Sequence, residues 1–166
     1  MDNWQLSLID KDLMYKVLSI PTCSQHEQRV REFLLKYSNA KGYEALLDDK
    51  GNAYLIKGTL GEGSYFPCVT AHMDSVHHKH IPYVKQNLPL PLLIDEVDGR
   101  HIIYANDIGI GGDDKAGIVI ALTVMEHLPE CKAVFFVEEE IGCGGSRNAD
   151  LQWFRDVGYI IAFDSR

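Results

Sequence analysis

Three apolar segments of the sequence are each followed directly by side chains that can bind a metal ion. These side chains are His72 and Asp74 after the first segment, Glu138, Glu139 and Glu140 after the second, and Asp164 after the third. Carboxylate oxygens and imidazole nitrogens are donors that zinc, cobalt and manganese accept. In open α/β sheets, ligands gather at the carboxyl ends of the strands. If the apolar segments are strands, the pattern predicts a binuclear metal site at one edge of a sheet.

The spacing of His72 and Asp74 suits a metal ligand and its orienting partner. At the end of an extended strand, residues two apart share a face. Asp74 can therefore accept the spare ring N–H of His72 and direct the other ring nitrogen toward a metal ion. Taken alone, the pair is better explained as a surface histidine beside a solvated aspartate, so the metal hypothesis depends on the other residues.

The run Glu138-Glu139-Glu140 is the most informative acidic feature. Adjacent desolvated carboxylates disfavour ionisation, so three of them at the end of a buried strand indicate a cation. An acidic run is usually a charged surface loop, but the preceding residues 133–137 are wholly apolar. A glycosidase acid pair is a second alternative. The glycosidase alternative gives no role to His72, Asp113 or Asp164.

Two further carboxylates, Asp113 and Asp114, open an apolar segment that we expect to be a helix. Carboxylates at a helix start accept hydrogen bonds from free N–H groups and suit the positive end of the helix dipole. That structural role is enough to explain an aspartate at position 114. The glycines around Asp113 leave room for a ligand there, so we consider Asp113 the better candidate for a functional role. A dinucleotide-binding loop is rejected, because Asp114 replaces the third glycine of its motif and two carboxylates repel a phosphate.

Together these residues are suited to metal-assisted hydrolysis. Two metal ions about 3.5–4 Å apart can share a carboxylate and hold a water between them. A carboxylate that binds neither ion is then needed to take a proton from that water, a contribution of roughly 10²–10⁴-fold in rate.

Three segments carry a family resemblance: Thr70-Ala71-His72-Met73-Asp74-Ser75-Val76, Gly112-Asp113-Asp114-Lys115-Ala116-Gly117 and Glu139-Glu140-Ile141-Gly142. They resemble the three motifs of the co-catalytic dizinc exopeptidases, in particular the peptidase T, carboxypeptidase and aminoacylase group. The Asp-Asp-Lys-Ala-Gly sequence is most similar to peptidase T. The resemblance covers nearly the whole chain, in order.

The resemblance implies a set of metal ligands. His72, Asp113 and Asp164 bind the first metal ion. Asp113 bridges to the second ion, which Glu140 also binds. Two zinc ions occupy the complete family site, with cobalt or manganese as possible replacements, and no binding residue for any other cofactor is implied.

The resemblance also implies roles in catalysis. Glu139 is the general base that activates the bridging water and later protonates the leaving amine, and Asp74 orients His72. A cis peptide is expected between Asp113 and Asp114.

Members of this family are longer than the present sequence. They contain a lid or dimerisation domain and a late histidine that completes the second metal site, whereas this sequence ends at Arg166. We therefore expect residues 1–166 to be the N-terminal portion of a catalytic domain, binding one divalent ion or none and showing little or no activity alone. The histidines that could replace the missing ligand are His77, His78, His80, His101 and His127, none of which lies in a family motif.

The leading hypothesis is a zinc-dependent aminopeptidase that acts on short peptides, with a homodimer possible for the full-length protein. Alternatives of the same fold are a carboxypeptidase and an amidohydrolase that removes acyl groups from amino acids. An alternative of another class is a non-catalytic metal-binding or assembly module.

The elements that position these residues alternate between helices and strands. Helices are expected at 10–20, 24–40, 116–128 and 149–156, and strands at 43–48, 52–57, 66–71, 92–97, 101–105, 133–137 and 159–163. A capping box at Ser24–Glu27 opens the second helix, and Asp98-Gly99 predicts a hairpin turn. Residues 75–90 are expected to be a surface excursion. The alternation predicts a three-layer α/β/α sandwich on a mixed sheet.

The bulk composition is typical of one globular domain, with 166 residues, 46% apolar and 24% charged. A formal net charge of −8 argues against nucleic acid as a partner. No run of 18 apolar residues suggests a membrane span. The start Met1-Asp2-Asn3-Trp4 lacks the features of a signal peptide, and the four cysteines form no CxxC pair. We expect a cytoplasmic protein.

Overall fold

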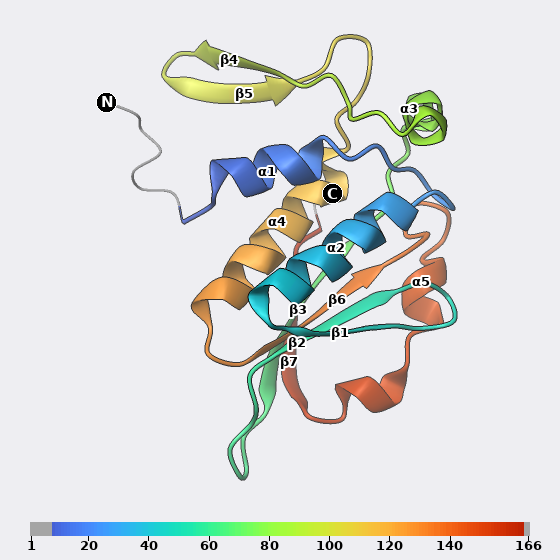
Figure 1. Cartoon of the computed structure of the whole chain (residues 1–166). Helices are drawn as coiled ribbons and strands as arrows, with labels where there is room; N and C mark the ends of the chain where they lie inside the picture. Colours follow the sequence, from blue (N-terminus) through green and yellow to red (C-terminus); the bar gives the residue numbers. More distant parts are fainter. Residues whose placement is uncertain (1–7, 165–166) are drawn as a thin grey trace.

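The structure, a computed structural model, describes residues 8–164 (Figure 1). The segment Met1-Asp2-Asn3-Trp4, on which the signal-peptide argument rests, lies outside the described residues. The helices are α1 (Lys11–Leu18), α2 (Gln28–Lys41), α3 (Ile81–Gln86), α4 (Gly112–His127) and α5 (Gly144–Arg147), with the short 3₁₀ helices η2 (His78–His80) and η3 (Leu151–Phe154). The strands are β1 (Glu44–Leu47), β2 (Ala53–Lys57), β3 (Phe66–His72), β4 (Leu93–Val97), β5 (Arg100–Tyr104), β6 (Cys131–Phe136) and β7 (Val157–Ala162).

A five-stranded mixed sheet forms the centre of the fold, in the order β1-β2-β6-β3-β7. Strand β3 pairs in parallel with both β6 and β7, whereas β2 runs antiparallel to β6 and to β1. The predicted α/β fold on a mixed sheet is confirmed. Because β6, β3 and β7 are parallel, the residues that follow them emerge at the same edge of the sheet.

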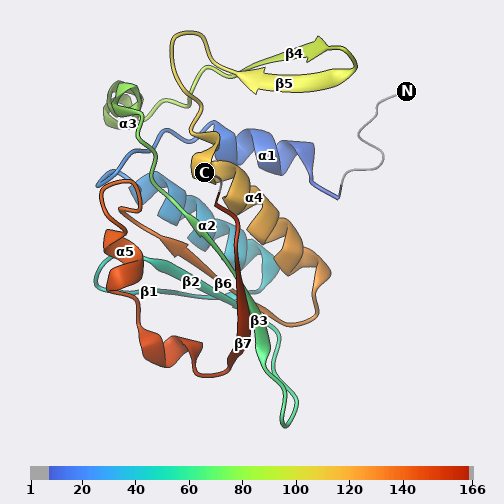
Figure 2. The ribbon, with the colours of Figure 1, turned by 180° about the vertical axis from the view of Figure 1, so that it is seen from behind.

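Helices α1, α2 and α4 cover one face of this sheet (Figures 1 and 2). The core beneath them includes Val17 of α1, Leu34 of α2 and Leu122 of α4, packed with Leu55 and Phe135 of the sheet. Helix α4 packs against β3 and β6, which holds its N-terminus beside the end of β3. Although α4 is apolar on most sides, no helix in the described part of the chain is long and apolar enough to cross a membrane.

The opposite face of the sheet is covered by fewer residues than the helix-bearing face. A small apolar cluster beneath η3 contains Tyr54, Val134 and Trp153. Strand β7, at the edge of the sheet, exposes Tyr159 and Ile161. The helix-bearing face therefore supplies most of the packing that fixes the strand ends.

The ends of α1 and α2 follow local sequence signals, with one correction. Asp10 caps α1 by accepting a hydrogen bond from a backbone N–H of the first turn at 2.8 Å, and Gly42 ends α2 in the left-handed conformation at φ 71°. The predicted capping box is wrong, since no side chain caps α2 and the Ser24 hydroxyl donates to Asp74 at 2.7 Å instead. A buried carboxylate is a stronger acceptor partner for this hydroxyl than a local backbone group.

Other local predictions have mixed outcomes. The hairpin of β4 and β5 is confirmed, with Asp98 and Gly99 both at positive φ in its turn. Residues 75–90 contain η2 and α3 and bury His80 completely, so their description as a surface excursion is wrong at that residue. Helix α5 was not predicted, and the expected helix at 149–156 is the shorter η3.

Candidate metal centre

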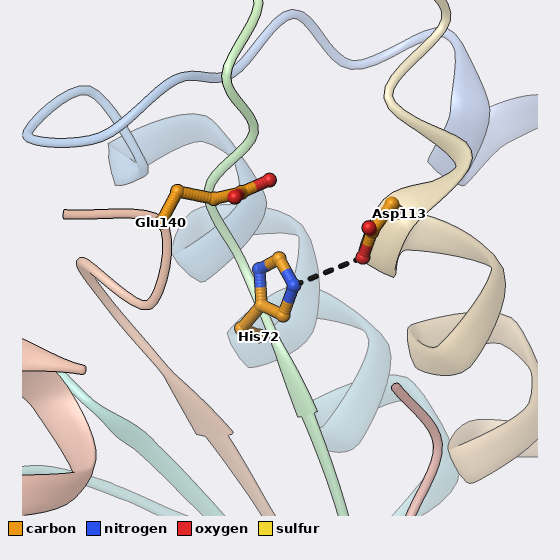
Figure 3. A group of neighbouring side chains, drawn as sticks. All are labelled: His72, Asp113 and Glu140. Carbon is orange, nitrogen blue, oxygen red and sulfur yellow. Dashed lines mark hydrogen bonds and ion pairs between the residues drawn. The ribbon is translucent and has the colours of Figure 1, made fainter. Parts of the chain in front are cut away.

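His72 ends strand β3 and exposes only 3% of its surface. Its Nδ1 lies 3.1 Å from the backbone oxygen of Asp74 and 3.3 Å from the carboxylate Oδ1 of the same residue. Both oxygens accept hydrogen bonds, so the proton of a neutral imidazole belongs on Nδ1. The other nitrogen, Nε2, points into the site, 3.2 Å from Oδ1 of Asp113 (Figure 3).

The surroundings of His72 favour a positive charge. Burial lowers the pKa of His72, but the hydrogen bond to Asp74 and the charges of Asp114, Asp74 and Glu139 outweigh it and raise the pKa to about 9. Without a metal ion, the imidazole is therefore protonated at neutral pH and balances part of the negative charge. A divalent cation can replace that proton, because a metal-binding histidine must be neutral.

The two aspartates at the start of α4 have different surroundings, and the expected cis peptide between them is present. Asp113 is half exposed and directs its carboxylate at His72. Asp114 is buried and accepts hydrogen bonds from the backbone N–H of His72 at 3.0 Å and of Gly117 at 3.1 Å. Burial raises the pKa of Asp114 to about 7, although these hydrogen bonds oppose the shift. Asp113 thus faces the site, whereas Asp114 fastens α4 to β3.

The loop after β6 turns its three glutamates in different directions. Glu138 has a left-handed backbone at φ 53° and forms an ion pair with Lys50 at 2.6 Å. Glu139 faces the site, with Oε2 4.0 Å from Nε2 of His72. The Sγ of Cys143 donates to the other oxygen of Glu139 at 3.4 Å. The cation expected beside the acidic run is therefore, for Glu138, the ammonium group of Lys50.

His72, Asp113 and Glu140 form a group that could hold a metal ion (Figure 3). One donor atom from each residue lies within 4.8 Å of the donor atoms of the other two. Asp164 follows β7 and is half exposed, with Oδ1 3.9 Å from Nε2 of His72. All four predicted ligands therefore lie at one edge of the sheet, and Glu140 belongs to the group of three with His72 and Asp113.

The histidines considered as replacement ligands lie outside this group in the described part of the chain. His80 is buried, with Nε2 2.6 Å from the carbonyl oxygen of Gly109 and Nδ1 2.8 Å from that of Thr22. His77 packs on His80, with the ring centroids 5.3 Å apart. His127 lies at the far end of α4, its Nδ1 2.8 Å from a carbonyl of the same helix. The arrangement gives no support to a local substitute for the missing ligand.

Lys115 is a positioning residue that the sequence did not reveal. It is fully buried, and its Nζ donates to the carbonyl oxygens of Leu18 at 2.7 Å and Ile20 at 2.9 Å, at the end of α1. Burial lowers the pKa of Lys115 to about 7. These bonds hold the start of α4, and with it Asp113, against the end of α1. The signal available in the sequence was a lysine directly before the largely apolar residues 116–125.

No family model matches the chain. The cytosol non-specific dipeptidase of Escherichia coli (strain K12) is 28% identical over 161 residues, which cover 93% of this chain and 32% of that protein. The crystal structure of aminoacylhistidine dipeptidase from Vibrio alginolyticus superposes with a TM-score of 0.73 at 19% identity, over 100% of this chain and 36% of that one. Aminopeptidase PepT from Bacillus cereus gives a TM-score of 0.72 at 20% identity, over 96% of this chain and 44% of that one.

The chain is thus similar in sequence to a dipeptidase and similar in fold to a second dipeptidase and to an aminopeptidase. Its relative and its structural neighbours are dipeptidases and a peptidase T, so the resemblance drawn from the three motifs is confirmed. The chain spans about a third of the length of the Escherichia coli dipeptidase, at 32%, and 36% and 44% of the two solved chains.

Proposed function

We propose that this chain carries part of the active site of a zinc-dependent aminopeptidase that acts on short peptides. The observation that carries the proposal is the convergence of the donor atoms of His72, Asp113 and Glu140 within 4.8 Å of one another. One imidazole and two carboxylates are a donor set that zinc accepts. The similarity to dipeptidases and to peptidase T supports peptides as the substrate class.

The donor set fits zinc, with cobalt or manganese as alternatives. We assign His72, Asp113 and Asp164 to one ion, and Asp113 and Glu140 to a second. Catalytic zinc usually has three protein ligands, a number that the first set reaches and the second does not. This chain alone should therefore bind one divalent ion well, and Glu140, whose donor atom lies within 4.8 Å of those of His72 and Asp113, is placed to help hold it. Bound zinc polarises a carbonyl oxygen and lowers the pKa of water.

Glu139 is the proposed general base. Its carboxylate is partly exposed, and one of its oxygens lies 4.0 Å from Nε2 of His72, so it faces the proposed metal site. Glu139 takes a proton from the attacking water and later gives it to the leaving amine. Asp74 is completely buried and does not meet the substrate. Its role is to hold Nδ1 of His72, which keeps Nε2 directed at the site.

A non-catalytic metal-binding module is the second candidate, and the two-ligand set of Asp113 and Glu140 favours it for this chain in isolation. For the full-length protein we propose a homodimer in the cytoplasm, the latter supported by the cytosol dipeptidase among the relatives. Neither nucleic acid nor a membrane is proposed as a partner, in keeping with the net charge of −8.

The test combines zinc binding with peptide hydrolysis in the wild type and in two variants. His72→Ala should lose zinc binding, because it removes the central ligand. Glu139→Gln should keep zinc affinity within about threefold and abolish any residual turnover of a tripeptide, since removal of a general base costs about 10²–10⁴-fold. Wild-type protein without zinc affinity would contradict the proposal, and so would a Glu139→Gln variant that keeps the full turnover measured in an active wild type.

A further inference from the structure

The loop that carries Glu139 and Glu140 is held by side chains from distant parts of the chain. The backbone N–H groups of residues 137–140, four in succession, each donate to a side-chain oxygen. The acceptors are Asn52 Oδ1 for Val137 at 3.1 Å, Glu27 Oε1 for Glu138 at 3.1 Å, and the two carboxylate oxygens of Asp74 for Glu139 at 2.9 Å and Glu140 at 3.2 Å.

These acceptors are needed because strand pairing stops before the loop begins. The last residue of β6 in register with β3 is Phe136, opposite His72. Beyond it the backbone turns at Glu138, which has a φ of 53°. A buried N–H without a partner costs about 1–3 kcal/mol, so side chains must replace the missing strand partner.

We propose that Glu27 is a positioning residue for Glu139 and Glu140, acting through the backbone of Glu138. Glu27 is 3% exposed, and it precedes α2 without capping it through its side chain. Its Oε1 accepts from the backbone N–H of Gln25 at 3.0 Å as well as from Glu138. One oxygen of this buried side chain thus joins the backbone of Gln25 to that of Glu138, and we call this pair of hydrogen bonds the clamp.

The clamp acts at the residue where the loop changes direction. Glu138 sends its side chain to Lys50, whereas the next two side chains face His72. If the N–H of Glu138 is released, the turn can rotate, and the carboxylates of Glu139 and Glu140 lose their fixed direction. The inference rests on the proposed metal site, in which Glu140 is a ligand.

Two substitutions separate the hydrogen bond from other effects of Glu27. Glu27→Gln keeps an oxygen that can accept both hydrogen bonds and removes the negative charge. Glu27→Ser is too short to reach Glu138, but serine is a favoured residue before a helix, so α2 keeps a suitable start. Ser38→Ala is the control, because Ser38 is buried in the same helix and its hydroxyl donates only to carbonyls of that helix.

The experiment measures zinc affinity by calorimetry and amide hydrogen exchange of residues 138–140 without metal. Glu27→Ser should weaken zinc binding about tenfold, in the range typical of lost partners around a metal site, and should speed exchange at these amides. Glu27→Gln and Ser38→Ala should both stay within about twofold of wild type.

A folded Glu27→Ser protein with wild-type zinc affinity and exchange would overturn the inference. So would a Glu27→Gln variant as impaired as Glu27→Ser, because charge and not the hydrogen bond would then be responsible. Wild-type protein that binds no zinc would refute the proposed function. The exchange rates of the metal-free variants would still decide whether Glu27 holds the loop.

Discussion

The carboxylate of Asp74 lies 3.3 Å from Nδ1 of His72 while it accepts hydrogen bonds from the backbone N–H groups of Glu139 and Glu140. One buried side chain therefore fixes both the imidazole at the end of β3 and the loop after β6. Burial raises the pKa of Asp74, but the hydrogen bonds from His72, Ser24 and the Glu139 N–H outweigh it, and the pKa is lowered overall. Asp74 stays ionised and keeps all its acceptor positions.

Replacement of Asp74 by asparagine should disturb both groups at once. One carboxylate oxygen becomes an NH₂ group, which cannot accept, so one backbone N–H of the loop loses its partner. We expect a loss of about 1–3 kcal/mol in the free energy of unfolding and a loss of about 10–100-fold in zinc affinity. Urea denaturation and calorimetry measure the two effects.

Asp95→Asn is the matched control, because Asp95 is exposed on the β4–β5 hairpin, where its carboxylate accepts only from the hydroxyl of Tyr104. It should leave zinc affinity unchanged. An Asp74→Asn protein with the zinc affinity of the wild type would show that Asp74 does not orient His72.

The raised pKa of His72 predicts how zinc affinity depends on pH. Its value of about 9 in the folded protein exceeds the ordinary value of 6.5. The stabilisation from protonated His72 is therefore complete below pH 6.5 and is lost as the pH rises through about 9. Below that pH zinc must displace a proton, so its affinity should rise by up to about tenfold per pH unit and level off above it.

NMR titration of the His72 ring in the metal-free protein measures the pKa directly. The account also expects the His72 value to fall in Asp74→Asn. An imidazole that titrates near 6.5 would contradict the charge balance described here.

Asp113 and Asp114 are adjacent, but we expect substitution of Asp113 to affect zinc binding and substitution of Asp114 to affect stability. Asp113→Ala removes a half-exposed carboxylate that contacts His72, so zinc binding should be lost with little change in stability. Asp114→Ala leaves the buried N–H groups of His72 and Gly117 unsatisfied, which should cost about 1–3 kcal/mol of stability for each. Denaturation and zinc titration of both variants test the assignment, and equal loss of stability in the two would count against it.

Gly117 should be intolerant of any side chain. A Cβ at this position would collide with the carboxylate of Asp114 and the backbone oxygen of Phe163. Gly117→Ala should destabilise the protein by about 1–3 kcal/mol. Gly112→Ala is the control, since a Cβ there meets nothing within 4 Å, and it should change stability by about 1 kcal/mol or less. Similar melting temperatures for the two variants would refute the close approach.

The sheet edge and its acidic residues could be predicted because their signals are local. Residues 66–71 are largely apolar and residues 133–137 entirely so, and each run is followed at once by side chains that can bind a metal ion, which marks a buried strand and its carboxyl end. The hairpin turn at Asp98-Gly99 could also be predicted, because its conformation depends on two adjacent residues.

Features that depend on distant partners could not be predicted. Ser24 fits a capping box, but Asp74, fifty positions further on, takes its hydroxyl. Glu138 could not be told apart in the sequence from the two glutamates that face the site, because its ion-pair partner Lys50 is distant along the chain. His80 lies in a polar segment, yet the carbonyls of Thr22 and Gly109 enclose it. In each case the partner that decides the role is remote in sequence.

Zinc titration calorimetry of the wild-type chain, repeated with His72→Ala, tests the central claim most directly. The account predicts one tightly bound zinc ion per chain and none in the variant. Zinc at about 100 times its dissociation constant should stabilise the wild type by about 2.7 kcal/mol, seen as a higher melting temperature. Two equally tight ions, no binding by the wild type, or undiminished binding by His72→Ala would contradict it.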